Sequence, residues 1–543
     1  MSNDKKSNGL VKNASFLMMA TLISRIIGLL YKSPLSTVVG NVGMGYYGYA
    51  NNVYVILLLI SSYSIPMAVS KVVSERLALK QYRNAQKVFH GALIYAAVVG
   101  GVAALVAFFL GKYLLPVNQQ EALLALRMLA PTIFLSAILG VLRGFFQAHS
   151  TMLPTSVSQI IEQIANAIVS VGAAWLLIKS FGGDDNANAI YGAAGGTLGT
   201  GAGVVAGLLF MLFVYAINRK TILKKVARDR HTREESMMGV LKIIFLMVTP
   251  IIFNTFLYNA SSYLDSKIFS DILAMKGVGS QVVSGQWGEY SNYYISLINI
   301  PLALSSATSS AMMPEIASLY ITKNYEGANK KINEGVQLTM FLCIPAAVGL
   351  AVLAFPIMKL LFPKSSDLSG ILLAAGSVTV IFSALSTITN GVLQAIDQAK
   401  IPLRNSAISL ALNLITVAAC SYFFPSMGVF AVLLASLVFA ICMCVLNAVS
   451  LRKYLGHKND FVNGYGKPLI ASAGMGVVAW IAYYGLHLLV PVRIVCLGVA
   501  LILAVLVYMI LYVVVTKTTA EQLRKFPMGS YMVKVLRMIR VLK

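Results

Sequence analysis

The sequence predicts an all-α integral membrane protein with about 14 transmembrane helices, on three observations. Of its 543 residues, 58% are hydrophobic and only 11% are charged, and the mean hydropathy is +0.77. The apolar runs are continuous over lengths near the roughly 20 residues that cross a bilayer as a helix. They do not alternate polar and apolar residues as the strands of a barrel do. A bilayer is therefore the solvent that fits this composition.

Each apolar run is assigned one span, with boundaries good to a few residues. The spans are expected at 14–38, 46–70, 91–115, 126–148, 156–180, 189–217, 239–265, 290–313, 334–362, 369–396, 403–424, 428–450, 467–490 and 493–516. The first contains Arg25 and lacks a small-residue cleavage site, so we expect a retained span and not a signal peptide.

The net charge of +24 lies in the connections between spans, which excludes a nucleic-acid-binding surface. Basic and cation-poor connections alternate, which predicts that both termini lie in the cytoplasm. The basic ones are Lys71–Lys87, Arg219–Arg233, Lys323–Lys331 and Arg452–Lys458; the others include Gly40–Gly45, Phe181–Asn188 and Pro425–Gly428.

Two further features concern the tail and the cysteines. In the basic tail, residues 517–543, the side chains of Tyr531, Val535, Met538, Ile539 and Leu542 would share one helical face, opposite Lys534, Arg537, Arg540 and Lys543. This pattern predicts an amphipathic helix on anionic membrane lipids, with a disordered basic tail as the alternative. The five cysteines all lie in apolar spans, so we expect neither disulfides nor a metal site.

An internal repeat organises the chain. Lys80–Lys87 matches Lys323–Lys330, and Gly144–Ala148 matches Gly391–Ala395. Both copies start on the predicted cytoplasmic side, so the repeat is direct. It predicts two pseudo-symmetric six-helix lobes, residues 1–218 and 219–455, followed by two C-terminal helices within 456–516. Paired lobes of this kind are typical of transporters; a duplication kept for stability alone is the alternative.

Charged residues inside a span are costly, so they indicate a cavity or a partner. Arg25 lies near the middle of the first span, on one helical face with Thr21, Gly28 and Lys32, and Pro34 can kink the helix beyond it. We interpret Arg25 and Lys32 as a cationic stripe lining a water-filled cavity. Alternatively, Lys32 extends to the interface and a carboxylate holds Arg25 for packing.

The fifth span carries a polar stripe at helical spacing: Gln159, Glu162, Gln163, Asn166 and Ser170. Glu162 is the natural partner for a nearby cation or a site for a coupling ion, with a structural ion pair as the alternative. In the second lobe the candidate cavity residues are Asn254, Asp265, Asn299 and Asn390; hydrogen bonds that hold helices together are the alternative. Asp265 is expected near the outer end of its span.

No catalytic motif is visible, and the glycine-rich sixth span lacks the strand–turn–helix context of a dinucleotide site. Close helix packing explains those glycines better. We therefore expect a transporter and not an enzyme, with no catalytic residue, metal or cofactor.

Several segments resemble one known family. Ser24–Gly28 is similar to its S-R-x-x-G signature, and Ile65–Lys71, followed by Ser74-Glu75, to the end of its second span. Gly144–Gln147 with Pro154, Ser158-Gln159 and Glu162-Gln163 is similar to the connection from its fourth to its fifth span. The whole chain thus resembles the YtgP/SpoVB branch of MurJ-like flippases, within the multidrug/oligosaccharidyl-lipid/polysaccharide exporter superfamily. In the family, cavity cations hold a pyrophosphate, and Arg25 matches one of them. A second falls near Tyr31, beside Lys32, and an eighth-span arginine of some members falls near Ser296.

The resemblance implies a monomeric, two-lobed flippase in the bacterial cell membrane. It would move lipid II, an undecaprenyl-pyrophosphate-linked peptidoglycan precursor, by alternating access. The last two spans could line a groove for the lipid tail. Coupling to the membrane potential, to protons or to sodium is left open. The alternatives are a flippase for another lipid-linked polysaccharide, a multidrug cation antiporter of the same superfamily, and a non-transporting membrane scaffold.

Overall fold

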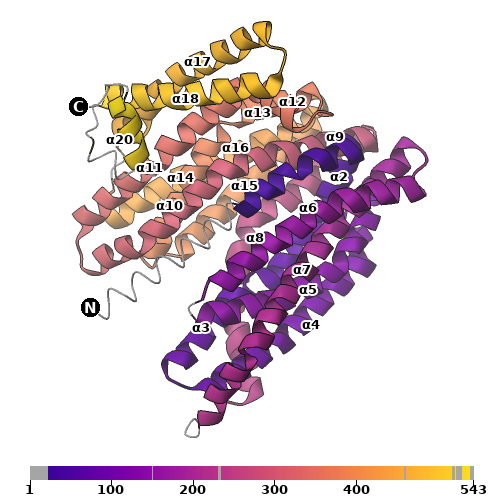
Figure 1. Cartoon of the computed structure of the whole chain (residues 1–543), viewed down its shortest axis with the longest axis vertical. Coiled ribbons are helices and arrows are strands. Elements are labelled where there is room, and N and C mark those ends of the chain that lie inside the picture. The colour runs from indigo at the N-terminus through magenta and orange to yellow at the C-terminus, as the bar shows by residue number, and fades with distance from the viewer. Residues whose placement is uncertain are drawn as a thin grey trace. The chain divides into compact units, whose positions relative to one another are not determined.

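The computed structural model describes residues 23–149, 151–229, 234–457, 460–516, 520 and 529–538. Over these residues the regular structure consists of helices alone, which confirms the all-α membrane fold (Figure 1). Eleven of the described helices are long and apolar enough to cross a membrane, or 12 when a pair bent by 47° counts as one. The predicted number of about 14 is not confirmed, and the first predicted span lies partly outside the described residues.

The first of two compact units comprises residues 1–292 and 417–429. Its helices are α2 (Lys32–Leu58), α3 (Ile65–Ala78), α4 (Tyr82–Leu114), α5 (Leu123–Ala148), α6 (Leu153–Phe181), α7 (Asp185–Arg228), α8 (Met237–Met275) and α9 (Ser280–Gly288). A π-helix, η1 (Leu59–Tyr63), joins α2 to α3. α8 lies against α2 and α4 of this unit, although the sequence assigns it to the second lobe. The lobe boundary at residue 218 stays a prediction.

The second unit comprises residues 293–416 and 430–543. It contains α10 (Ile295–Ile321), α11 (Tyr325–Val352), α12 (Ala354–Leu361), α13 (Asp367–Gly376), α14 (Thr379–Ala395), most of α15 (Lys400–Phe423), α16 (Phe430–Leu455), α17 (Lys467–Leu489), α18 (Arg493–Thr516) and α20 (Gly529–Met538). α17 and α18 run side by side, and α20 contacts α18 (Figure 1).

The repeat is visible in two matching helix ends. Lys80 after α3 and Lys323 after α10 have φ angles of 59° and 58°, in the left-handed region. In the first copy the backbone N–H of Gln81 donates to the Arg76 carbonyl over 2.9 Å. In the second copy the backbone N–H of Asn324 donates to the Leu319 carbonyl over 2.9 Å. Because this motif caps the last carbonyls of a helix, both chains turn in the same way before α4 and α11 begin.

A second pair of matching turns lies further along. α5 ends at Ala148 and α6 begins at Leu153, and α14 ends at Ala395 and α15 begins at Lys400, so both boundaries are shifted by 247 residues. Helix contacts repeat as well. Ser62 Oγ donates to the Ser136 carbonyl and Ser305 Oγ to the Ala384 carbonyl, each over 2.9 Å. These pairs confirm the pseudo-symmetry of the two copies.

Glycines set the contact between α6 and α7, as the sequence predicts. A Cβ added at Gly195 would overlap the backbone of Ala174, and one at Gly199 would overlap that of Ser170. The helix axes can approach closely only because these side chains are absent. This contact fixes α6, which carries Glu162, within the first unit.

Two local expectations concern Pro34 and the tail. The helix is interrupted at Tyr31, between helical residues 23–30 and α2, where Pro34 cannot donate a backbone hydrogen bond to Leu30. α2 is also kinked at Gly40, whose φ of 75° suits a residue without a Cβ. The predicted tail helix is present as α20, in which Met532 and Val533 are buried and Met538 is 73% exposed, and its contact with lipids stays a prediction. Ile539, Arg540, Leu542 and Lys543 lie outside the described residues, as do the side chains of Tyr531 and Val535.

Candidate functional site

The candidate site begins where helical residues 23–30 lie along α6. A Cβ at Gly28 would lie 3.6 Å from Gln163 Oε1, and Asn166 Nδ2 donates to the Tyr31 hydroxyl over 3.4 Å. Both contacts pair residues 135 positions apart, so the two segments run parallel. Arg25, one turn before Gly28, therefore lies at the level of Gln159 to Glu162. Its side chain is exposed.

The predicted cationic stripe is described over most of its length. Arg25 is exposed, and Gly28 and Lys32 are half-buried, whereas Thr21 lies outside the described residues. The spacing of Arg25, Gly28 and Lys32 places them on one side of the chain as it enters α2. Tyr31, which neighbours Lys32, is buried, with its hydroxyl 3.3 Å from that of Tyr47.

Glu162 is held by an arginine that the sequence reasoning did not single out. Arg143 of α5 forms an ion pair with Glu162 of α6, with 2.7 Å between Nη2 and Oε2. Its Nε also donates to Ser158 Oγ over 2.9 Å. The signal was present in the sequence, since Arg143 is a cation inside an apolar span.

Asn166 is buried within the first unit. Its Oδ1 accepts a hydrogen bond of 2.8 Å from Ser170 Oγ, which lies against the Gly196 carbonyl of α7 at 2.9 Å. These bonds tie α6 to α7 and to the start of α2. Asn166 thus orients the polar stripe on which Glu162 lies.

Two buried carboxylates lie elsewhere in the first unit. Asp265 is 3% exposed and precedes the end of α8 at Met275 by ten residues. Its neighbours Tyr263 and Lys267 donate to backbone carbonyls at the C-terminal end of α4, so Asp265 lies level with that helix end. Its expected place near the outer end of the membrane span stays a prediction. Glu289, which sequence reasoning missed, is also 3% exposed, and its Oε1 accepts a hydrogen bond of 2.7 Å from Asn41 Nδ2. The side chain of Asn254 on α8 lies outside the described part.

In the second unit the two candidates differ. Asn299 of α10 is exposed, whereas Asn390 of α14 lies in a buried amide cluster. Asn447 of α16 donates to Asn390 Oδ1 over 2.8 Å and to Thr389 Oγ1 over 3.0 Å, and it accepts from Asn405 Nδ2 over 2.9 Å. The cluster joins α14, α15 and α16, which is how uncharged polar residues hold membrane helices together.

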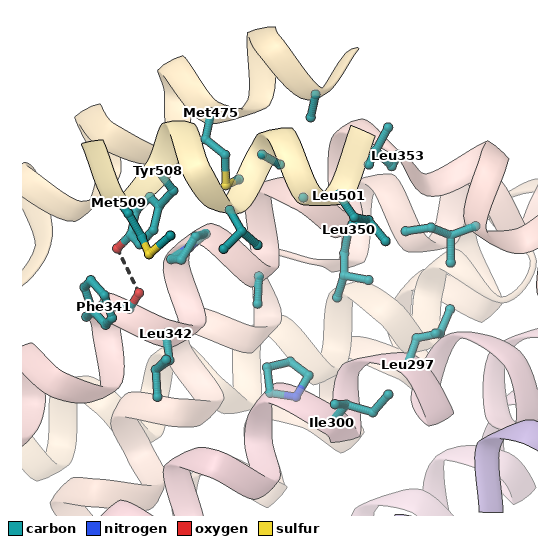
Figure 2. A pocket seen from close by; sticks show the side chains of 18 of the residues that line it. Leu297, Ile300, Phe341, Leu342, Leu350, Leu353, Met475, Leu501, Tyr508 and Met509 are labelled. Carbon is teal, nitrogen blue, oxygen red and sulfur yellow. Dashed lines mark hydrogen bonds between the residues drawn. The ribbon is translucent and has the colours of Figure 1, made fainter. Parts of the chain in front are cut away.

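The second unit also contains an apolar groove of about 650 Å³ (Figure 2). Its walls come from α10, α11, α12, α17 and α18, and Met532 of α20 completes the lining. Figure 2 shows Leu350, Met475 and Leu501 around it, and the Tyr508 hydroxyl donating to the Phe341 carbonyl over 2.8 Å. A charged group would lose its hydration in this groove, whereas an alkyl chain would not. Among the described residues no cluster of three His, Cys, Asp or Glu side chains could hold a metal ion.

Comparison with known proteins shows to which family the chain belongs. Residues 10–320 match the family model described as polysaccharide biosynthesis protein, which is more than half of the chain. The chain belongs to the polysaccharide biosynthesis protein family. It is 28% identical to the lipid II flippase MurJ of Bacillus subtilis (strain 168), over 75% of this chain and 77% of that protein. It is 23% identical to stage V sporulation protein B of the same organism, over 82% and 84%.

Solved structures agree on the fold of this family member. An inward-closed lipid II flippase MurJ superposes with a TM-score of 0.61 at 17% identity, covering 91% of this chain and 97% of that one. An inward-facing multidrug transporter of the MOP superfamily gives 0.63 at 15% identity, covering 79% and 95%. These relatives are flippases and transporters, which confirms the prediction of a MurJ-like transporter rather than an enzyme.

Proposed function

We propose that the protein flips lipid II from the inner to the outer leaflet by alternating access. The observation that carries the proposal is that the chain carrying Arg25 and Lys32 runs along α6, where Arg143 pairs with Glu162, so three cations belong to neighbouring segments of the first unit. A pyrophosphate carries strong negative charge and prefers Arg and Lys donors. Similarity to MurJ of Bacillus subtilis supports the same cargo.

The apolar groove of the second unit supports a lipid-linked cargo. An undecaprenyl chain needs a continuous apolar surface, and the groove offers about 650 Å³ between α11 and the last two spans. The head group would cross beside Arg25 while the chain stays among apolar side chains. In this account both parts of the cargo have a surface of matching chemistry.

The membrane potential is our proposed driving force. An inside-negative potential favours outward movement of an anion, by about 2.3 kcal/mol per charge per 100 mV. Coupling to protons or sodium is the alternative, with the buried carboxylates Asp265 and Glu289 as the groups to examine. Flipping that proceeds unchanged in liposomes without any potential or ion gradient would remove this part of the proposal.

The remaining expectations concern the protein's place in the cell. We propose that both termini lie in the cytoplasm, because the basic connections alternate with cation-poor ones. Similarity to the Bacillus subtilis proteins supports a place in the bacterial plasma membrane, where we propose that the protein works as a monomer. We also propose that the basic tail contacts anionic lipids, since Lys534 and Arg537 of α20 are exposed.

Two other functions share this fold. Teichoic or capsular precursors also carry a lipid-linked pyrophosphate, so a flippase for another polysaccharide precursor uses the same cations. A multidrug cation antiporter needs acidic cavity residues, and Arg143 already occupies the carboxylate of Glu162. The cation Arg25 at the same level would repel a cationic drug.

Complementation of a strain that lacks its lipid II flippase tests the proposal. The wild-type chain should restore growth, and Arg25→Ala should not, although the variant reaches the membrane in normal amounts. Arg127→Ala is the matched control, because Arg127 is also an exposed arginine on a membrane helix of this unit but contacts Phe108 instead. Full rescue by Arg25→Ala would remove Arg25 from the site, and no rescue by the wild-type chain would remove lipid II as cargo.

A further inference from the structure

We infer that Glu162 is a displaceable counter-ion: it neutralises Arg143 in the empty protein, and the diphosphate of the cargo takes its place. The inference rests on the proposed function and adds Arg143 to the groups that bind the cargo. No bond is made or broken in this exchange except the hydrogen bonds of one guanidinium.

The geometry of Arg143 leaves room for a second anion. Its guanidinium has five N–H groups, of which one contacts Glu162 and one contacts Ser158. The Ser158 hydroxyl donates its own hydrogen to the Thr155 carbonyl over 2.8 Å, so it accepts from Arg143. The other three N–H groups make no hydrogen bond to the described residues. Arg143 is thus held in place by Ser158 when Glu162 moves away.

Both members of the pair are accessible. The side chains of Arg143 and Glu162 are 15% and 22% exposed, so a ligand can reach them without unfolding a helix. Arg25 lies at the level of Gln159 to Glu162, as the parallel contacts at Gly28 and Tyr31 require. A diphosphate attracted by Arg25 therefore arrives next to the Glu162 carboxylate, where like charges repel and the carboxylate is driven off Arg143.

The second copy of the repeat shows whether helix packing alone requires an ion pair at the place of Arg143 and Glu162. With the shift of 247 residues, Arg143, Ser158 and Glu162 correspond to Asn390, Asn405 and Ser409. These three residues are buried, and two of them share the amide cluster around Asn447. The corresponding helix crossing is therefore built without an ion pair, although Arg404 donates from Nε and Nη2 to Asn405 Oδ1 over 3.3 and 3.1 Å. Packing does not demand an ion pair at this place, so the charges of the first copy need another explanation.

The energetics suit a reversible carrier. A charge-assisted hydrogen bond contributes roughly 1.5–3 kcal/mol whether the acceptor is a carboxylate or a phosphate. Exchanging one acceptor for the other therefore changes the free energy little, so the cargo can bind and also leave. An arginine with no counter-ion would bind the diphosphate more tightly and slow its release.

Binding of undecaprenyl diphosphate to the purified full chain in lipid nanodiscs tests the inference. Glu162→Gln removes the competing carboxylate and should tighten binding on the order of ten-fold. Arg143→Gln should weaken it by about as much, because it leaves Glu162 to repel the ligand. In Arg143→Gln/Glu162→Gln binding should return towards the wild-type value. Glu315→Gln is the matched control, since it removes the carboxylate of a 2.8 Å ion pair with Lys331 in the second unit, and it should leave binding unchanged.

The possible results distinguish a failure of the inference about Glu162 from a failure of the proposed function. If the wild-type protein binds the probe but folded Glu162→Gln binds it equally or more weakly, the pair is structural and the inference is wrong while the proposed function stands. An unchanged affinity in Arg143→Gln has the same meaning. Should Glu162→Gln fail to fold, the comparison of the double variant with Arg143→Gln decides, and equal affinities contradict the inference. No binding by the wild-type protein removes the proposed function and the inference together.

Discussion

Arg143 and Asn390 occupy the same position in the two copies of the repeat, one residue before Gly144 and Gly391. Arg143 forms an ion pair with Glu162 on the next helix, and Asn390 accepts a hydrogen bond from Asn447. The two copies therefore use one backbone arrangement for different chemistry. The Arg143–Glu162 pair is partly exposed and Asn390 is buried, so cargo contact is our proposal for the first copy and helix packing for the second.

The amide cluster should be a main source of stability in the second unit. Asn447→Leu removes three hydrogen bonds and leaves the amide of Asn405 and the oxygens of Thr389 and Asn390 with fewer partners. At roughly 0.6–1 kcal/mol per bond, we expect a loss of about 2 kcal/mol. The thermal unfolding midpoint in detergent should fall clearly below that of Asn218→Leu, whose exposed amide contacts only its own helix. Equal midpoints would contradict the assigned role.

Two glycine substitutions should have opposite effects at the α6–α7 contact. Gly199→Ala forces a Cβ into the Ser170 backbone and should destabilise the protein by roughly 1–3 kcal/mol. Gly172→Ala on α6 meets nothing within 4 Å and should be neutral or slightly stabilising, because alanine favours a helix. Thermal unfolding of the two variants measures the difference. A stable Gly199→Ala would mean that the helices are further apart than described.

Replacing either of the two lysines with left-handed backbone conformation by glycine should change the stability of the protein in the same direction. Lys80→Gly and Lys323→Gly remove the strain of a Cβ at a φ near 60°, which is worth about 1 kcal/mol. We expect each variant to unfold at a slightly higher temperature. Leu79→Gly is the control: φ at Leu79 is −81°, so the added flexibility should lower the midpoint. Opposite responses of the two lysine variants would argue against the matching turns.

The apolar groove should matter for long lipid chains only. Ala504→Phe narrows the groove, since Ala504 is 5% exposed and lines its wall. It should reduce flipping of an undecaprenyl-linked cargo several-fold, because the chain loses apolar contact area. Flipping of a short-chain analogue should be unaffected. Val514→Phe on the same helix faces away from the groove and serves as the control. Equal losses for both cargo lengths would indicate a general packing defect.

The all-α membrane fold was predictable from the sequence, because hydrophobic length acts at the scale of whole helices, whereas the predicted number of about 14 spans is not confirmed. Arg25 could be selected as a candidate because the cost of a charge inside a span is visible without a structure, and its role stays a prediction. The partner of Glu162 was not predictable in the same way. The pair joins residues 19 positions apart on two helices, and only the register of α5 against α6 selects Arg143 over the other cations.

Asp265 illustrates the difference between an apolar run and a helix. The apolar run ends near Asp265, whereas α8 continues to Met275 and the Asp265 side chain is buried. Hydropathy reports where apolar residues stop, whereas the helix continues wherever backbone hydrogen bonds do. Asn390 needed tertiary contacts as well, because a buried amide network and a cavity-lining stripe have the same spacing along a helix.

Flipping of lipid II in proteoliposomes that contain only this protein tests the central claim most directly. The wild-type protein and Arg127→Ala should move lipid II across the bilayer, faster under an inside-negative potential, and Arg25→Ala should move none above the rate of empty liposomes. Movement of lipid II by Arg25→Ala at the wild-type rate, or none by the wild-type protein, would contradict the account.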